Sequence, residues 1–583
     1  MKRLLEKIEA IGVQTDRDNA NVGNNFSAKL LRIASEANKE YILRNVLRSD
    51  LKKLHEDGTL YYHDLDSFNL TINCLHIPTG EILEKGFNTG YGFIRPPKNI
   101  MSASALSCIL LQSTQNDMFG GQSHVDFDND MAKYVALTKD EIGEEGLEKA
   151  IRKAMKSVVY NLNTMHSRAG SQVPFSSINL GLPNSKDSAL ICKIFLEEYD
   201  KGLGNGEQPI FPNIIFRVKD GVNKKPEDPY YYLFKLACDI ASRRMNPTFM
   251  NIDSSFNKPW YDRGILPATM GCRTYLMDNV NGEPGVKGRG NIAPVTINLP
   301  RIAIKSEQSL DMFFTELNSV LVYALDSLMF RYNVLKRLKV KDLPFVAGQR
   351  ILKGSENLNL NDSIETILKQ GTWGIGFIGL AETLTALTGK HHGEDEKSRE
   401  LGELIIKHIR DFCDKYKEKY KLNIACYATP AEGLSGKFIE KDKKKFGNIK
   451  GVTDKEYYTN SFHVPVSHKI SMADKIKIEA PYHALCNGGH ISYIEVDGKP
   501  TGADIEKIIR YAYDETDISY MGINFHIKYC KKCGNDIKEE IKICNKCGST
   551  DIQGISRVTG YLSLDERFCF SKAMEREDRT SHN

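Results

Sequence analysis

The chain has 583 residues, of which 41% are apolar and 26% charged, which is the composition of a soluble globular protein with a substantial core. Its 79 basic and 75 acidic side chains leave a net charge of only +4, so nothing favours binding to nucleic acid or to a membrane surface. The first residues mix both charges without an apolar core, which excludes a secretory signal, and we expect no membrane span. Thirteen cysteines, mostly scattered singly, favour a reducing cytoplasm over a disulfide framework.

The predicted secondary structure alternates between strands and helices. Residues 1–45 predict polar-faced helix, and residues 50–55 predict a helix that Gly58 ends. Residues 68–74 alternate between apolar and polar, which is the period of a strand. A clear helical pattern begins at Ser309, and short apolar runs predict further strands at 175–180, 209–218, 295–299, 374–380 and 491–496. Together these elements favour an α/β sheet or barrel.

One glycine pattern is misleading. Gly374, Gly376 and Gly379 satisfy GxGxxG, but residues 368–373 before them do not form the buried strand that a dinucleotide site requires. We therefore expect these glycines to allow close packing in a strand.

Four cysteines near the C-terminus form two CxxC pairs, Cys530–Cys533 and Cys544–Cys547. Four thiolates at this spacing can converge on one tetrahedral Zn²⁺ as a closed structural site. Each pair is followed by a glycine, Gly534 or Gly548, which lets the backbone fold back over the metal. The alternative is four ordinary thiols, which this spacing disfavours.

The segment Arg557-Val558-Thr559-Gly560-Tyr561 follows the cysteine pairs. It resembles the loop of the glycyl radical enzymes that carries the radical, and the zinc knuckles before it narrow the resemblance to the anaerobic (class III) ribonucleotide reductases. A glycine suits this role because its α-carbon radical lies between an amide nitrogen and a carbonyl, with no side chain to prevent planarity. Without the knuckles, Gly560 would be interpreted as an ordinary turn residue.

The resemblance implies a ten-stranded α/β barrel of two antiparallel halves with a small C-terminal zinc-ribbon domain. The domains expected are an N-terminal helical segment at 1–45, a catalytic barrel at 46–525, the zinc ribbon at 526–550, and the glycyl radical loop with its tail at 551–583. The first segment is too short for an ATP-cone of roughly 100 residues, so we expect no on/off nucleotide site in this chain.

The resemblance also implies two active-site cysteines. Met270-Gly271-Cys272-Arg273 resembles the loop of the thiyl cysteine, and Cys74 matches the family's second cysteine. Judged alone, each would be a buried apolar residue. Thr274 stands where the aerobic relatives place a carboxylate base. The chain therefore resembles the formate-dependent branch, in which formate supplies the carboxylate, and Met270 near Cys272 also fits that branch.

Two further stretches resemble parts of the family's substrate site. The role of the active-site asparagine passes to Asn291, with Asn298 as the weaker candidate. Thr429, Pro430, Ala431 and Glu432 resemble the substrate phosphate loop. By spacing alone the same residues could be an ordinary helix start with proline near its first position. Residues 458–463 and 487–493 match family blocks without an assigned role.

The function implied is the anaerobic reduction of ribonucleoside triphosphates to 2′-deoxyribonucleoside triphosphates, the precursors of DNA, with formate as reductant. The cofactors implied are structural Zn²⁺, a glycyl radical at Gly560, and S-adenosylmethionine with a [4Fe-4S] cluster on a separate radical-SAM activase. The partners implied are the nucleotide substrate, an allosteric nucleotide at a dimer interface, and a second copy of the chain. The alternatives are another glycyl radical enzyme of the formate-lyase or dehydratase type, and a non-enzymatic zinc-ribbon binding protein.

Overall fold

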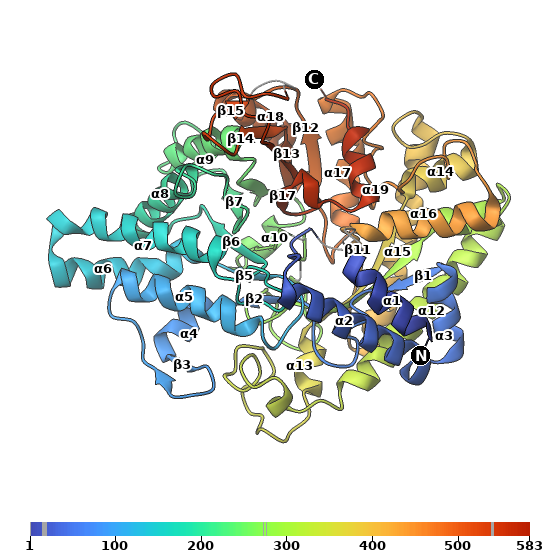
Figure 1. Cartoon of the computed structure of the whole chain (residues 1–583), viewed down its shortest axis with the longest axis horizontal. Helices are drawn as coiled ribbons and strands as arrows, with labels where there is room; N and C mark the ends of the chain where they lie inside the picture. The colour runs from blue at the N-terminus through green and yellow to red at the C-terminus, as the bar shows by residue number, and fades with distance from the viewer. Residues whose placement is uncertain (1, 14–19, 272, 276, 538–541, 583) are drawn as a thin grey trace.

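The computed structural model describes residues 2–13, 20–271, 273–275, 277–537 and 542–582. Two sheets occupy the centre of the molecule and helices surround them (Figure 1). The helices are α1 (Lys2–Val13), α2 (Phe26–Tyr41), α3 (Ser49–Asp57), α4 (Thr79–Lys85), α5 (Ile100–Thr114), α6 (Phe127–Ile142), α7 (Glu144–Thr164), α8 (Lys186–Asp200), α9 (Tyr231–Arg244), α10 (Lys258–Tyr261), α11 (Leu299–Lys305), α12 (Leu310–Leu335), α13 (Glu365–Gln370), α14 (Leu380–Thr388), α15 (Glu396–Tyr420), α16 (Gly433–Phe446), α17 (Met472–Leu485), α18 (Gly502–Glu515) and α19 (Phe570–Glu577).

The larger sheet has seven strands in the order β12-β13-β8-β7-β6-β5-β2. Strands β2, β5, β6, β7 and β8 run parallel, β12 is parallel to β13, and β13 pairs antiparallel with β8. Their bounds are β2 (Leu75–Ile77), β5 (Gln122–His124), β6 (Ser176–Leu180), β7 (Asn213–Val218), β8 (Thr248–Asn251), β12 (Ser492–Glu495) and β13 (Tyr520–Asn524).

The smaller central sheet has the order β1-β9-β10-β11, with β1 (Leu60–Tyr62) antiparallel to β9 (Asn291–Asn298). Strands β9, β10 (Thr372–Ile378) and β11 (Asn423–Ala428) are parallel and buried along their whole length. Backbone hydrogen bonds connect the two sheets, from Cys74 N just before β2 to Asn291 O in β9 at 2.9 Å, and from Ala428 N in β11 to Gly489 O before β12 at 3.0 Å. The predicted α/β class is confirmed, whereas a closed ten-stranded barrel stays a prediction because no continuous ladder joins the two sheets among the described residues.

The remaining strands form a hairpin and a C-terminal sheet. The hairpin pairs β3 (Phe87–Asn88) with β4 (Phe93–Ile94). The C-terminal sheet has the order β15-β14-β16-β17, and β14 and β15 lie at the top of Figure 1. Its bounds are β14 (Ile527–Cys530), β15 (Asp536–Ile537), β16 (Ile552–Arg557) and β17 (Leu562–Leu564).

Several local predictions are confirmed. Gly58 caps α3 at φ +87°, and Ser309 caps α12 by accepting a hydrogen bond from Met312 N. The five apolar runs overlap β6, β7, β9, β10 and β12. The predicted strand at residues 68–74 is wrong, because β2 begins only at Leu75. Residues 68–74 form no ladder, so alternation alone did not make them a strand.

Helix α12 corrects the expectation that no segment reaches the length of a membrane span. By length and composition Leu310–Leu335 meets that criterion. However, the helix buries one face that includes Phe313, Leu317 and Leu321 in the protein core. A core helix of a soluble protein passes the same test, so α12 is weak evidence for a membrane.

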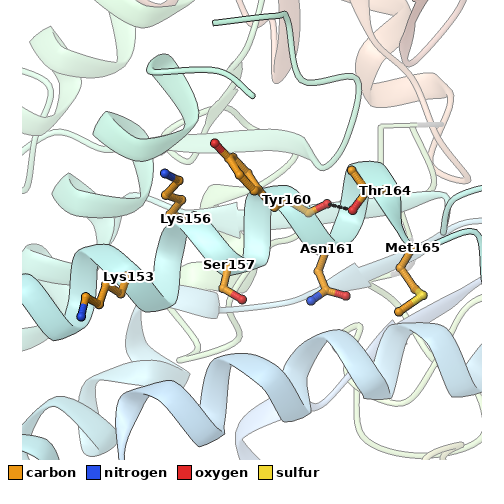
Figure 2. A pocket seen from close by; sticks show the side chains of 7 residues that line it. All are labelled: Lys153, Lys156, Ser157, Tyr160, Asn161, Thr164 and Met165. Atoms are coloured by element: carbon orange, nitrogen blue, oxygen red, sulfur yellow. Dashed lines mark hydrogen bonds between the residues drawn. The ribbon is translucent and has the colours of Figure 1, made fainter. Parts of the chain in front are cut away.

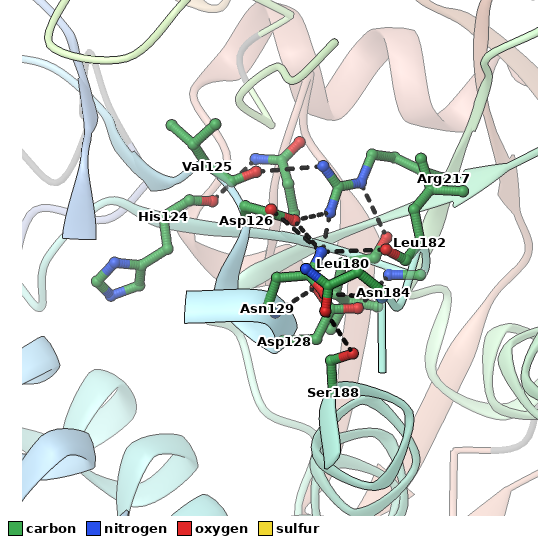
Figure 3. Close-up of polar contacts among 12 residues, drawn as sticks. His124, Val125, Asp126, Asp128, Asn129, Leu180, Leu182, Asn184, Ser188 and Arg217 are labelled. Carbon is green, nitrogen blue, oxygen red and sulfur yellow. Dashed lines mark hydrogen bonds and ion pairs between the residues drawn. The ribbon is translucent and has the colours of Figure 1, made fainter. Parts of the chain in front are cut away.

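A buried ionic cluster lies just beyond the carboxyl ends of β5, β6 and β7 (Figure 3). The fully buried Arg217 contacts Asp126 at 2.7 Å and Asp128 at 3.6 Å, and Asp128 also accepts a hydrogen bond from Gly181 N at 2.8 Å. Burial and the neighbouring Asp126 raise the pKa of Asp128 to about 7, although Arg217 opposes this. Removing one partner of such a cluster typically costs about 3–5 kcal/mol, so it anchors this end of the sheet.

Candidate active site and metal centre

The four cysteines of the CxxC pairs converge at the edge of the C-terminal sheet, with their sulfur atoms all within 4.8 Å of one another. The Sγ atoms of Cys530 and Cys547 are 3.5 Å apart, and those of Cys533 and Cys544 are 3.7 Å apart. A tetrahedral zinc with Zn–S bonds of about 2.3 Å requires sulfur separations of roughly 3.8 Å. The predicted set of thiolates therefore fits a structural zinc ion.

The backbone of each pair has the expected tight turn. Gly534 N donates to Cys530 O and Gly548 N donates to Cys544 O, both at 2.9 Å. The two glycines have φ values of +67° and +70°, which favour residues without a Cβ. Glycine is therefore required here by backbone conformation.

The loop that contains Gly560 is buried between the C-terminal sheet and the central sheets. A turn between β16 and β17 carries it, and Val558 N donates to Tyr561 O at 2.9 Å. A Cβ on Gly271 would lie only 2.6 Å from Gly560 O, so the two backbones are in direct contact. The predicted thiyl residue Cys272 follows Gly271 but lies outside the described residues.

Distant segments hold this loop in place. Tyr561 OH donates to Glu432 Oε2 at 3.0 Å, and its ring packs edge-on against Phe175 at 4.8 Å between centroids. On the other side of Gly560, Tyr493 OH donates to Thr559 O. Burial raises the pKa of Tyr561 well above its ordinary value, and Glu432 adds to this, so the phenol remains a donor.

The second predicted cysteine, Cys74, is buried at the amino end of β2. Its thiol donates to Asn73 Oδ1 at 2.6 Å, and the amide nitrogen of Asn73 donates to Asp64 Oδ2. Burial raises the pKa of Asp64 to about 6, although Arg331 opposes the shift. The carboxylate thus fixes the amide of Asn73 with its oxygen toward the thiol.

Met270 and Cys74 lie beside one short glycine segment. A Cβ on Gly120 would be 2.8 Å from Cys74 Sγ, and a Cβ on Gly121 would be 3.7 Å from Met270 Sδ. Two glycines here allow both sulfur-containing side chains to approach the same backbone.

The two candidate asparagines have different surroundings. Asn291 begins β9, is buried, and its side-chain oxygen has no hydrogen-bond partner among the described residues. Asn298 caps α11 by accepting from Arg301 N, and its amide donates to Gly58 O at 3.0 Å and Asp442 Oδ2 at 2.8 Å. Only Asn291 retains an acceptor for a ligand, so the geometry favours it.

The predicted phosphate loop connects β11 to α16. Helix α16 begins at Gly433, so Pro430 precedes the helix and does not stand near its first position, as the alternative of an ordinary helix start would require. Thr429 Oγ1 lies 2.8 Å from Thr296 Oγ1, which in turn lies 2.7 Å from His63 Nε2. Glu432 accepts from Tyr561, which joins this loop directly to the glycine loop.

Sequence analysis missed several residues of the site. Asn213 at the start of β7 would meet a Cβ on Gly271 at 2.5 Å, and neither side-chain polar atom of Asn213 has a described partner. Tyr493 lies in a block that was noted without a role, whereas no local pattern distinguishes Asn213.

A shallow hollow on the outer face of α7 is separate from this site (Figure 2). All of its lining residues belong to α7 or to Met165 directly after it, and they include Lys153, Lys156 and Tyr160. None of the predicted site residues contributes to it.

Comparisons with known proteins agree with this arrangement. The family model described as anaerobic ribonucleoside-triphosphate reductase matches residues 18–582. The chain is 33% identical to the anaerobic ribonucleoside-triphosphate reductase of Escherichia coli (strain K12), covering 91% of this chain and 78% of that protein. It is 31% identical to the enzyme of the same name from Enterobacteria phage T4, covering 91% and 90%.

Solved structures share the fold at lower identity. The anaerobic ribonucleotide reductase from Thermotoga maritima in complex with dATP and CTP has a TM-score of 0.73 at 18% identity, covering 99% of this chain and 98% of that one. A glycyl radical enzyme from Archaeoglobus fulgidus has a TM-score of 0.69 at 10% identity, covering 100% and 90%. The extent of the family match and of the relatives shows that this chain belongs to the anaerobic ribonucleoside-triphosphate reductases.

Proposed function

We propose that this chain reduces ribonucleoside triphosphates by passing a radical from Gly560 to Cys272. The observation that carries the proposal is the contact between Gly560 and Gly271, the residue before Cys272. A hydrogen atom can transfer between two residues only when they touch, and a backbone contact with the residue before Cys272 supports such a transfer. Both loops are also buried, which excludes water from a reactive intermediate.

The remaining residues take distinct roles around the ribose. Cys272 removes the 3′-hydrogen, and Cys74 protonates the 2′-hydroxyl as it leaves as water. Asn291 offers its free carboxamide oxygen to the substrate, and Met270 lies beside the same glycine segment as Cys74. With formate as reductant the reaction balances, because ribonucleotide, formate and one proton give deoxyribonucleotide, CO₂ and water.

The nucleotide partners follow from the family and from one solved relative. That relative binds dATP and CTP. For this chain we assign the substrate phosphates to Thr429–Glu432, and an effector nucleotide to the interface of a homodimer. A radical-SAM activase with a [4Fe-4S] cluster forms the radical at Gly560, and the reaction takes place in the cytoplasm.

Zinc has a structural role in this proposal. The four cysteines fix one end of the sheet that carries Gly560, because β14 pairs with β16. We propose the corresponding domain boundaries, with the N-terminal helical segment at 1–45, the barrel at 46–525, the zinc ribbon at 526–550 and the radical loop with its tail at 551–583.

Replacing the thiyl residue tests the relay. Cys272→Ala, activated anaerobically with its activase, should show the glycyl radical by electron paramagnetic resonance but form no deoxynucleotide. Cys192→Ala, at a buried cysteine of α8, is the matched control and should keep both. Turnover by the Cys272→Ala variant would refute the relay, and a carbon–carbon cleavage product from the unaltered enzyme would favour a different glycyl radical reaction.

A further inference from the structure

A small cavity lies between the loop of Arg273 and the loop of Gly560. Arg273 follows Cys272 in the sequence, and Thr559 precedes Gly560, so the cavity is one residue from each proposed radical position. The space open to a small molecule is about 40 Å³. On that scale one water needs roughly 10–15 Å³, so the cavity has room for about three such atoms and none for a nucleotide.

Arg273 brings an unused positive charge to this cavity. Its side chain is 1% exposed, and neither Nε nor Nη1 has a hydrogen-bond partner within the described part of the chain. Its nearest aromatic neighbour is Tyr493, with the guanidinium 5.9 Å from the ring centroid. A buried guanidinium with free donors is a strained arrangement that an anion would relieve.

The acidic side chains of the cavity wall already have partners. Glu495 accepts from Asn524 Nδ2 at 2.7 Å. Glu479, which lies behind the wall residue His463, accepts from Lys475 and from Ser492 Oγ at 2.6 Å. Glu575 accepts from Lys572 and, at 3.2 Å, from Arg579. These pairs leave Arg273 without a carboxylate within 4.0 Å among the described residues, and the cations Arg557 and Arg579 also line the cavity.

His463 forms the opposite wall. Its Nδ1 lies 3.2 Å from Glu479 Oε2, and its Nε2 has no described partner. Burial by itself would raise the pKa of Glu479, but Lys475 and His463 hold that pKa well below its ordinary value, so the carboxylate accepts from Nδ1–H. Nε2 is thus left toward the cavity, where a bound anion would favour its protonation and make it a second donor.

We infer that this cavity binds a small carboxylate, and that Arg273 is the main group that holds it. In the reaction proposed above, on which this assignment rests, the carboxylate is formate. The three heavy atoms of formate match the available volume, and the unused donors match its charge. Formate held here would lie next to the loop of Cys272 while the nucleotide occupies a separate site.

Steady-state kinetics of Arg273→Gln test the assignment. Loss of one charge-assisted contact should raise the KM for formate by on the order of tenfold or more. The KM for the nucleoside triphosphate should stay within about twofold, and Arg273→Lys should restore part of the affinity. Arg263→Gln removes an exposed arginine from the same stretch of chain and should change neither constant.

Binding to the resting protein gives an independent readout. ¹³C-formate should show line broadening with the unactivated full-length protein, and Arg273→Gln should abolish it. Val464→Ile leaves every charge in place but adds a methylene to a buried residue of the cavity wall, so it should also weaken formate binding. If Arg273→Gln fails to fold or to form the glycyl radical, Val464→Ile carries the test.

The outcomes separate this assignment from the proposed function. If the KM for formate is unchanged in both variants and deoxynucleotide is still formed, the cavity is not the formate site, whereas the proposed function is unaffected. Absence of line broadening with the unaltered resting protein would also overturn it. The unaltered protein could also bind formate, lose this binding in Arg273→Gln, and yet form no deoxynucleotide after activation. That result would support formate binding in the cavity and refute ribonucleotide reduction.

Discussion

The zinc knuckles and the glycine loop belong to one small sheet, but they are held by opposite means. The knuckles depend on contacts within about twenty residues of chain, and Cys533 and Cys547 remain partly exposed. The glycine loop is buried and depends on Glu432, Tyr493 and Phe175. The metal therefore fixes the base of the sheet, whereas the central sheets determine where Gly560 lies.

This difference has a consequence for activation. In the proposed function a separate activase must reach the α-carbon of Gly560, and that residue is buried against Gly271. A few polar contacts and one aromatic cluster hold the loop, and these can separate without unfolding the thiolate cluster. If the four thiolates hold zinc, as proposed above, the C-terminal sheet can move as a unit and return Gly560 to the same position.

Removing the metal should break this arrangement most severely. Cys547→Ser, or treatment with a strong chelator, should reduce deoxynucleotide formation by more than about 100-fold, because structural zinc contributes on the order of 10 kcal/mol to such small sites. The helices and central sheets should remain folded. Zinc content, circular dichroism and the radical signal together measure the outcome.

The control is Lys532→Ala, which changes an exposed residue inside the first knuckle and keeps all four thiolates. It should retain zinc and activity. Normal turnover by a zinc-free Cys547→Ser protein would contradict the idea that the metal positions the radical loop.

The same contrast explains which features could be predicted from the sequence. The knuckles were predictable because their spacing and glycines are local, and the strands because buried runs are continuous. Residues 68–74 were not predictable in this way, because apolar and polar residues also alternate in turns such as the one in which Leu70 N donates to Ser67 O. Pairing decides whether a segment is a strand. The link between Glu432 and Tyr561 joins distant segments that no local pattern relates.

Near the central sheets, the protonation state of Asp64 should control how firmly Asn73 holds the thiol of Cys74. Its pKa is about 6, raised from 3.8 mainly by burial, so folding favours the protonated form and the stability this group contributes is lost as the pH rises through about 6. The ionised form is the stronger acceptor from Asn73 Nδ2, so it holds the amide oxygen toward Cys74 more firmly than the protonated form does. Turnover should therefore fall about tenfold as the pH drops below 6.

Asp64→Asn should remove the loss of turnover below pH 6, the acid limb of the pH profile. Its turnover should be lower than that of the unaltered enzyme and nearly independent of pH. Asp66→Asn is the matched comparison, because Asp66 accepts from Ser35 Oγ at 2.6 Å and its charge raises the pKa of Asp64, so this variant should keep the loss of turnover at low pH but move it to lower pH. The measurement is the pH dependence of deoxynucleotide formation at a constant radical content. An unchanged acid limb in Asp64→Asn would assign the titration to another group.

The smallest expected effect concerns the docking of the glycine loop itself. Tyr561→Phe keeps the ring between Phe175 and Phe211 but removes the donor to Glu432. Glu432 retains its hydrogen bond from Ala20 N at 2.8 Å, so the cost should be about 1–2 kcal/mol and confined to the loop. Hydrogen exchange at residues 556–562 should become faster by roughly 5–30-fold, while exchange in β9 and β10 stays the same. Tyr529→Phe, in β14 of the same sheet, should have no such effect. If exchange in the loop did not change in Tyr561→Phe, the phenol would not be one of its anchors, and the aromatic packing would have to supply the docking energy.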